Sequence, residues 1–121
     1  MHDSSLVIAK FGGTSVANFE AMKNCVRIVS QNTDCKLVVT SAPAGITNHL
    51  VELGKTPMSG EDKEIILQRI EQQIFDIYEQ LNDKQSVKPK LDNLFAGIQK
   101  VVYADGINES PMLQDELLSY G

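Results

Sequence analysis

The stretch Leu6-Val7-Ile8-Ala9-Lys10-Phe11-Gly12-Gly13-Thr14-Ser15-Val16 decides the fold of this chain, because it joins a short apolar run to two adjacent glycines. The unbroken hydrophobicity of residues 6–11 predicts a strand that is buried on both faces. Apolar residues then recur at helical spacing over residues 19–29, and Asn18 can cap that helix. A second β-branched run over residues 36–41 completes a strand–helix–strand unit, which nearly always forms a parallel, right-handed crossover. The first third of the chain therefore predicts an α/β fold.

The remainder of the chain is helical in pattern and contains no linker or repeat. Residues 46–53 predict a short helix that Gly54 closes. Ser59 can cap a longer helix whose isoleucines form one apolar stripe. Pro89 can open the next helix, and Ser110-Pro111 is a start signal for a last one. We expect an α/β protein with a mainly parallel sheet and a helix-rich second half.

Composition limits the classes of protein to which the chain can belong. Its 121 residues, 42% of them apolar, are enough for one domain and too few for two. A net charge of −5 excludes nucleic-acid binding by bulk charge. The chain has no apolar run of the roughly 20 residues that a membrane span needs, nor a signal peptide, which predicts a cytoplasmic protein. Cys25 and Cys35 are too few for a disulfide framework and do not have the spacing of metal ligands.

The segment of residues 10–16, which we call the glycine loop, has the chemistry of a phosphate site. Gly12 and Gly13 let the backbone approach a ligand closely, and their N–H groups can point at anionic oxygens. Lys10 supplies a point charge suited to phosphate, and Ser15 adds a hydroxyl donor. A plain tight turn would also use two glycines. However, a lysine at the end of a buried strand needs a partner, because burying an unpaired ammonium group is costly.

Two better-known nucleotide motifs do not occur. Gly54-Lys55-Thr56 resembles the end of a Walker A loop, but His49 stands where that motif requires glycine. No G-x-G-x-x-G sequence occurs, so a dinucleotide fold has no support.

The second loop, Ser41-Ala42-Pro43-Ala44-Gly45-Ile46-Thr47-Asn48, follows the second predicted strand. In a parallel sheet it lies at the same carboxyl edge as the glycine loop, where open α/β sheets bind their ligands. Ser41 and Thr47 can hydrogen-bond a small polar substrate there. Capping of the following helix by Thr47 or Asn48 explains the same residues equally well.

The two loops together resemble the aspartokinases, of the amino acid kinase superfamily. The glycine loop matches the family's N-terminal K-F-G-G-[TS]-S signature, and the second loop is similar to its S-A-x-x-x-[IV]-T-N stretch. Asp115-Glu116-Leu117-Leu118-Ser119-Tyr120-Gly121 looks like the family's D-E-L-x-S-x-G-E. The resemblance covers essentially the whole of residues 1–121 and is closest to the monofunctional, lysine-sensitive type. It implies the N-terminal part of a three-layer αβα amino acid kinase domain.

The resemblance also implies an activity and assigns roles to residues. The reaction is the phosphorylation of the side-chain carboxylate of L-aspartate by ATP with Mg²⁺, the first step of lysine, threonine and methionine biosynthesis. Lys10 would be the catalytic residue that contacts the transferred phosphoryl group. Gly12, Gly13 and Ser15 would bind the nucleotide phosphates, together with Lys10. Thr47 would hold aspartate, with Ser41 a weaker candidate beside it.

Other functions stay open at this point. The family's glutamate that follows S-x-G, its later catalytic residues and its regulatory domains do not occur in residues 1–121, so we expect a truncated piece that is inactive alone. An acetylglutamate, glutamate or UMP kinase is a second possibility, although the residue identities at Phe11–Val16 and in the Ile-Thr-Asn segment argue against it. A third is a non-catalytic fragment that binds phosphate weakly or self-associates through uncovered apolar surface. The full-length family member is expected to be a homo-oligomer.

Overall fold

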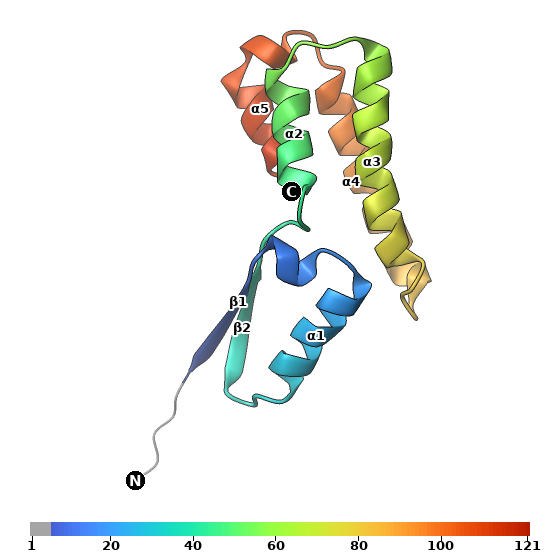
Figure 1. Ribbon diagram of the computed structural model, residues 1–121. Coiled ribbons are helices and arrows are strands. Elements are labelled where there is room, and N and C mark those ends of the chain that lie inside the picture. The colour runs from blue at the N-terminus through green and yellow to red at the C-terminus, as the bar shows by residue number, and fades with distance from the viewer. Residues whose placement is uncertain (1–5) are drawn as a thin grey trace. The chain divides into compact units, whose positions relative to one another are not determined.

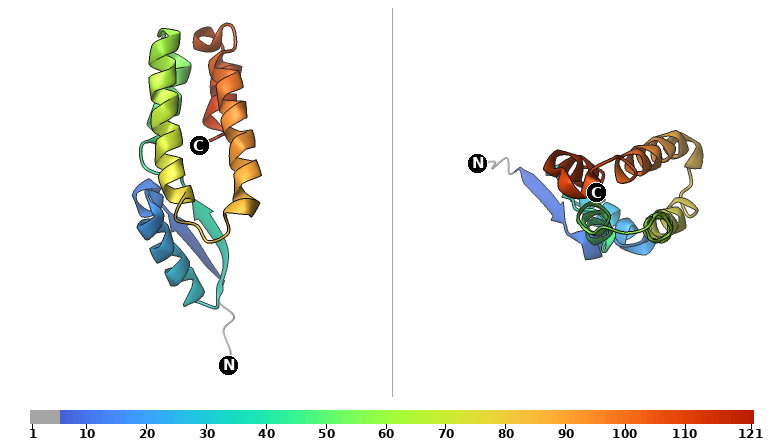
Figure 2. Two further views of the ribbon diagram at one scale, coloured as in Figure 1. Left: turned by 90° about the vertical axis from the view of Figure 1, so that its right-hand side faces the viewer. Right: turned by 90° about the horizontal axis from the view of Figure 1, so that it is seen from above.

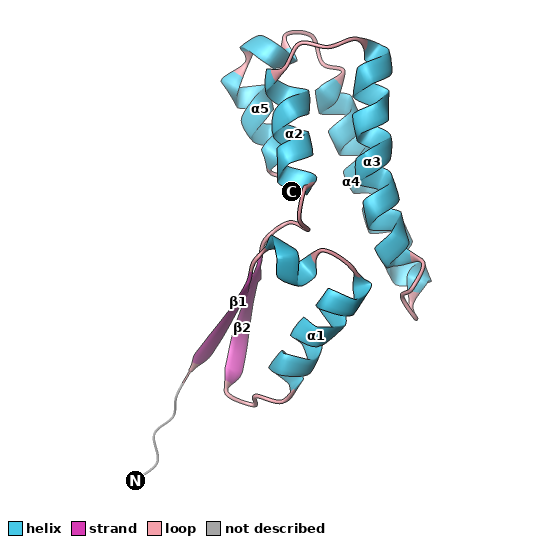
Figure 3. Ribbon diagram, in the orientation of Figure 1, coloured by secondary structure: helices cyan, strands magenta, loops and turns pink. Residues whose placement is uncertain are grey.

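The computed structural model describes residues 6–121 and divides after Ala44 into two compact units, each of which we describe by itself. The first unit contains two strands and one long helix (Figures 1 and 3). Its elements are β1 (Val7–Phe11), the 3₁₀ helix η1 (Gly13–Val16), α1 (Phe19–Ser30) and β2 (Cys35–Thr40). The second unit, Gly45–Gly121, is wholly helical. It consists of α2 (Ile46–Lys55), α3 (Gly60–Tyr78), α4 (Lys84–Val102), the 3₁₀ helix η2 (Ile107–Glu109) and α5 (Pro111–Leu118).

The strand–helix–strand prediction for the first unit is confirmed. β1 and β2 pair in parallel, with Phe11 opposite Thr40 at their carboxyl ends. The Ser41 N–H continues the ladder by donating to the Phe11 carbonyl over 3.0 Å. The helix between the strands begins as predicted, because the Asn18 side chain accepts a hydrogen bond of 2.9 Å from the Ala21 N–H. The segments that follow the two strands therefore start at one edge of the sheet.

The prediction that the strands are buried on both faces is wrong for this structure. Ile8 in β1 is 56% exposed, and Val39 in β2 is 43% exposed. Among the described residues the sheet has only these two strands, and one helix of the first unit covers one of its faces (Figure 1). A continuous apolar run shows that a strand suits burial on two faces, but the covering layers must come from other elements.

The helices of the second unit share one core. Helices α3 and α4 lie side by side in both views of Figure 2. Helix α5 packs against α2 and α4. The fully buried side chains of this core are Leu50, Leu53, Val102 and Leu117. The predicted isoleucine stripe of α3 contributes three buried residues, namely Ile66, Ile70 and Ile77. None of the described helices is long and apolar enough to cross a membrane.

The predicted starts of α3 and α5 are confirmed, and the predicted start of α4 is wrong. The Ser59 and Ser110 side chains each accept the N–H three residues ahead, over 3.1 and 3.2 Å. However, α4 does not begin at Pro89. Asp83 caps it instead, by accepting the Ser86 N–H over 3.3 Å. A proline in the second turn of a helix removes a single backbone hydrogen bond, so the cap decides where the helix starts.

Candidate functional site

The glycine loop turns sharply as soon as β1 ends. The Ser15 N–H donates to the Gly12 carbonyl over 3.0 Å and forms the turn of η1. Gly13 lies against the second loop: a Cβ there would be 3.1 Å from the Ala42 carbonyl oxygen. The Gly13 carbonyl also accepts the Ala44 N–H over 3.1 Å. The close approach of two backbones therefore requires glycine at position 13.

Gly12, by contrast, has open space on the side where a side chain would be. A Cβ on Gly12 would meet no atom within 4 Å, so the backbone there is accessible to a ligand. Within the part of the chain that the structure describes, the N–H groups of Gly12 and Gly13 donate to no backbone carbonyl. Two unused amides and an open face at the end of a strand fit the phosphate oxygens of a nucleotide.

Lys10 is exposed, so the argument that a lysine at the end of a buried strand needs a partner does not apply in this structure. Successive side chains of a strand point to opposite faces, and in β1 those of Ile8 and Lys10 share one face. Among the described residues of the first unit, both are exposed on that face. Lys10 forms no ion pair among the described residues, so its charge is free to meet an anionic ligand.

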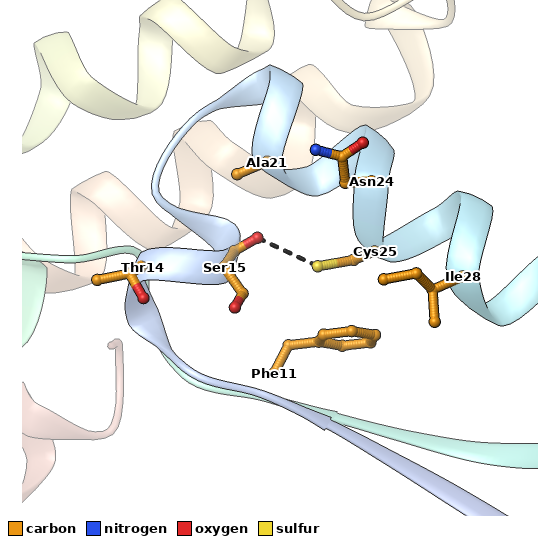
Figure 4. A pocket seen from close by; sticks show the side chains of 7 residues that line it. All are labelled: Phe11, Thr14, Ser15, Ala21, Asn24, Cys25 and Ile28. Atoms are coloured by element: carbon orange, nitrogen blue, oxygen red, sulfur yellow. Dashed lines mark hydrogen bonds between the residues drawn. The ribbon is translucent and has the colours of Figure 1, made fainter.

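Ser15 connects the glycine loop to α1. Its carbonyl accepts a hydrogen bond of 3.1 Å from the thiol of Cys25, which is buried (Figure 4). The two residues border a cavity of about 280 Å³ between β1 and α1. The other lining residues are Phe11, Thr14, Ala21, Asn24 and Ile28. Of the predicted phosphate contacts, Ser15 lines this cavity, whereas Lys10, Gly12 and Gly13 do not.

Thr47 and Asn48 lie inside the first turn of α2 and do not cap it. The N-cap is Gly45, whose φ of 90° is left-handed and favours glycine, and no side chain caps the helix. Capping was the competing explanation for these two residues, and the structure removes it. Both side chains are exposed and available for other contacts.

The end of the chain lies beside Thr47 within the second unit. A Cβ on Gly121 would be 3.5 Å from Thr47 Oγ1 and 3.5 Å from Leu50 Cδ1. This proximity arises because α5 packs along α2, where Gly54 leaves room for Gln114 and Leu117 of α5. The second loop and the D-E-L-x-S-x-G segment, far apart in the sequence, thus supply neighbouring atoms, which no local pattern indicates.

The predicted site residues are distributed over both units. Lys10, Gly12, Gly13 and Ser15 belong to the first unit, in which the loop that begins at Ser41 packs against the glycine loop. The remaining residue, Thr47, belongs to the second unit. Two contacts went unpredicted, the Cys25–Ser15 hydrogen bond and the approach of residue 121 to Thr47.

Alanine substitutions at the two glycines should differ in their effect on folding stability. Gly13→Ala forces a methyl group to 3.1 Å from the Ala42 carbonyl oxygen, so we expect a loss of folding stability of about 1–3 kcal/mol. Gly12→Ala meets open space at an ordinary φ of −78°, so its stability should stay within about 0.5 kcal/mol of the parent chain. Urea unfolding of both variants measures the difference. Equal destabilisation of the two variants would contradict the geometry of the loop.

Comparison with known proteins finds similar sequences and structures for most of this chain. The model of the amino acid kinase family matches residues 5–109. Lysine-sensitive aspartokinase 3 of Escherichia coli is 41% identical over 118 residues, which are 98% of this chain and 26% of that protein. "Putative inactive aspartokinase 3" of Haemophilus influenzae is 48% identical over 61 residues, half of each chain.

A solved structure agrees with these relatives. E. coli aspartokinase III in complex with aspartate and ADP matches with a TM-score of 0.89 and 36% identity, over 97% of this chain and 26% of that one. The match confirms the predicted helix-rich α/β fold with a parallel sheet. The chain spans about a quarter of the length of these E. coli proteins.

Proposed function

This chain belongs to the amino acid kinase family, and on that premise we propose that it is the nucleotide- and substrate-binding first part of an aspartate kinase. The reaction is the transfer of the γ-phosphoryl group of ATP to the side-chain carboxylate of L-aspartate. A bond forms between a carboxylate oxygen and the γ-phosphorus, the bond from that phosphorus to ADP breaks, and 4-phospho-L-aspartate and ADP result. The observation that supports this proposal best is the glycine loop, with its open Gly12 and its free Lys10.

The glycine loop would bind and orient the phosphates. The N–H groups of Gly12 and Gly13, which donate to no carbonyl in residues 6–121, are suited to the oxygens of the transferred group. Lys10 would offset the negative charge that spreads over those oxygens during transfer. The Ser15 N–H is already used within η1, so its contribution would come from the hydroxyl group. Phosphoryl transfer needs such positioning and charge stabilisation more than covalent catalysis.

Mg²⁺ would enter together with the nucleotide. The residues that the structure describes contain no group of three or more histidine, cysteine, aspartate or glutamate side chains that could hold a metal ion. When bound to the nucleotide, Mg²⁺ would neutralise phosphate charge. What the chain itself supplies is the amides and the ammonium group of the glycine loop.

Thr47 would bind aspartate, with Ser41 as a weaker candidate. The Thr47 hydroxyl is exposed, it takes no part in capping α2, and the chain near Gly121 forms one wall beside it. Ser41 is also exposed. Its N–H donates to the Phe11 carbonyl, which fixes the backbone that carries the Ser41 hydroxyl. Aspartate is the ligand that the solved E. coli relative contains together with ADP.

Isothermal titration tests the proposal on the chain itself. We expect saturable binding of Mg-ATP and of L-aspartate, and no heat with UMP or N-acetylglutamate at the same concentrations. Thr47→Ala should weaken the binding of aspartate and leave that of Mg-ATP unchanged, because the residue is assigned to the amino acid only. Binding of UMP or N-acetylglutamate in preference to aspartate would assign the chain to another kinase of the family.

A non-catalytic, self-associating fragment is the second candidate, and the exposed sheet favours it. Leu37, Val38 and Val39 of β2 are all exposed, and an uncovered apolar strand promotes association. Light scattering at rising concentration separates this candidate from a monomer. A clean monomer at high concentration would eliminate it.

A further inference from the structure

We propose that Tyr120 is a positioning residue for aspartate binding at Thr47: its ring packs on Gly97 of α4 and thereby holds the main chain of Gly121 beside the Thr47 hydroxyl. The proposal rests on the proposed function, because it takes Thr47 as the aspartate contact. It adds two residues, Gly97 and Tyr120, to which the sequence analysis assigned no role. All four residues lie in the second unit.

The Tyr120 ring packs against Gly97 of α4 at a distance that only glycine allows. A Cβ on Gly97 would lie 2.7 Å from Cζ and 2.8 Å from Cε1 of Tyr120, and closer still to its hydroxyl oxygen. Real Cβ atoms do not approach other atoms so closely, so any larger residue would displace the ring. Glycine in the interior of a helix costs about 1 kcal/mol relative to alanine. Gly97 therefore weakens α4 locally, and the tyrosine ring occupies the space that it leaves.

The backbone at Gly121, which follows Tyr120, lies beside Thr47. Residue 121 is bonded directly to Tyr120, and its N–H donates to the Leu118 carbonyl over 3.1 Å. Its Cα is close enough to α2 that a Cβ would be 3.5 Å from Thr47 Oγ1. One peptide link thus connects a ring fixed on α4 to a backbone segment that borders the Thr47 hydroxyl. The proposed consequence is that displacing the ring also moves that segment.

The rest of α5 is held independently of the ring. Leu117 is fully buried, and its Cδ2 atom would be 3.5 Å from a Cβ on Gly54 of α2. Ser110 caps the start of the helix. Loss of the Tyr120 packing on Gly97 should therefore leave α5 in place and affect only the residues that follow it, of which Tyr120 and Gly121 keep their N–H bonds to the Leu117 and Leu118 carbonyls. This separates positioning from general folding.

Four variants of the full chain test the proposal. Gly97→Ala displaces the ring, Tyr120→Ala removes it, and Tyr120→Phe keeps the ring without its hydroxyl. Gly60→Ala is the control, because this helical glycine has no atom within 4 Å of its Cβ position. Two readouts apply to each variant: the amide resonances of Thr47 and Gly121 in ¹H–¹⁵N correlation spectra, and the affinity for L-aspartate by titration.

We expect Gly97→Ala and Tyr120→Ala to shift both resonances and to weaken aspartate binding by at least about tenfold, which is about 1.4 kcal/mol. Tyr120→Phe and Gly60→Ala should retain the spectrum and the affinity of the parent chain. Unchanged Thr47 and Gly121 resonances in Tyr120→Ala would overturn the proposal. If the parent chain binds no aspartate, the proposed function fails, while the resonance shifts still decide whether Tyr120 positions Gly121.

Discussion

Mg-ATP should bind the Lys10→Ala variant about 10- to 100-fold more weakly than the parent chain, which corresponds to the roughly 1.5–3 kcal/mol of a hydrogen bond to a charged group. The physical reason is that Lys10 is exposed near the end of β1, forms no ion pair within residues 6–121 and is the first residue of the glycine loop. Isothermal titration with Mg-ATP measures the change.

Lys36→Ala is the matched control for this substitution. Lys36 belongs to the same unit and carries the same charge, but it lies near the start of β2, whose Cys35 pairs with Val7 at the far end of the sheet. Its ammonium group donates to the Thr33 carbonyl over 2.9 Å. Nucleotide affinity should therefore stay unchanged in this variant. An equal loss in both variants would reduce the role of Lys10 to that of general surface charge.

The Leu117→Ala variant should lose about 2–5 kcal/mol of folding stability, a large part of the 5–15 kcal/mol typical of a domain. Leu117 is fully buried in the core of the second unit and packs where Gly54 leaves room for it on α2. Truncation opens a cavity at the junction of α2 and α5. Thermal and urea unfolding measure the loss.

Met112→Ala provides the comparison on the same helix. Met112 is 77% exposed, so its truncation should change the free energy of unfolding by less than about 0.5 kcal/mol. Should the two truncations destabilise the chain equally, α5 could not be packed through Leu117 as the structure has it.

Local signals in the sequence predicted the parts of the fold that local physics determines. Asn18, Ser59 and Ser110 cap helices as expected, since a cap depends on a side chain and an amide three residues away. The parallel pairing of β1 and β2 followed from the strand–helix–strand order, because a helical crossover typically joins parallel strands. Pro89 misled the prediction of α4, because the Asp83 cap outweighed one lost hydrogen bond.

Contacts between distant segments were not predictable from the same signals. The exposure of Ile8 depends on which elements cover the sheet, and an apolar run contains no information about them. The approach of Gly121 to Thr47 depends on how α5 packs along α2. One hint was present, because a glycine inside a helix, such as Gly97, is unfavourable unless close packing uses it. Its partner, Tyr120, could be identified only from the structure.

The central claim, that the glycine loop binds the phosphates of ATP, is tested most directly by titrating the ¹⁵N-labelled chain with Mg-ATP. The amide resonances of Gly12 and Gly13 should shift progressively and saturate, because their N–H groups are the unused donors of the loop. The resonance of Gly106, in the turn before η2 of the second unit, should stay in place. Saturable shifts at Gly106 and none at Gly12 and Gly13 would contradict the account.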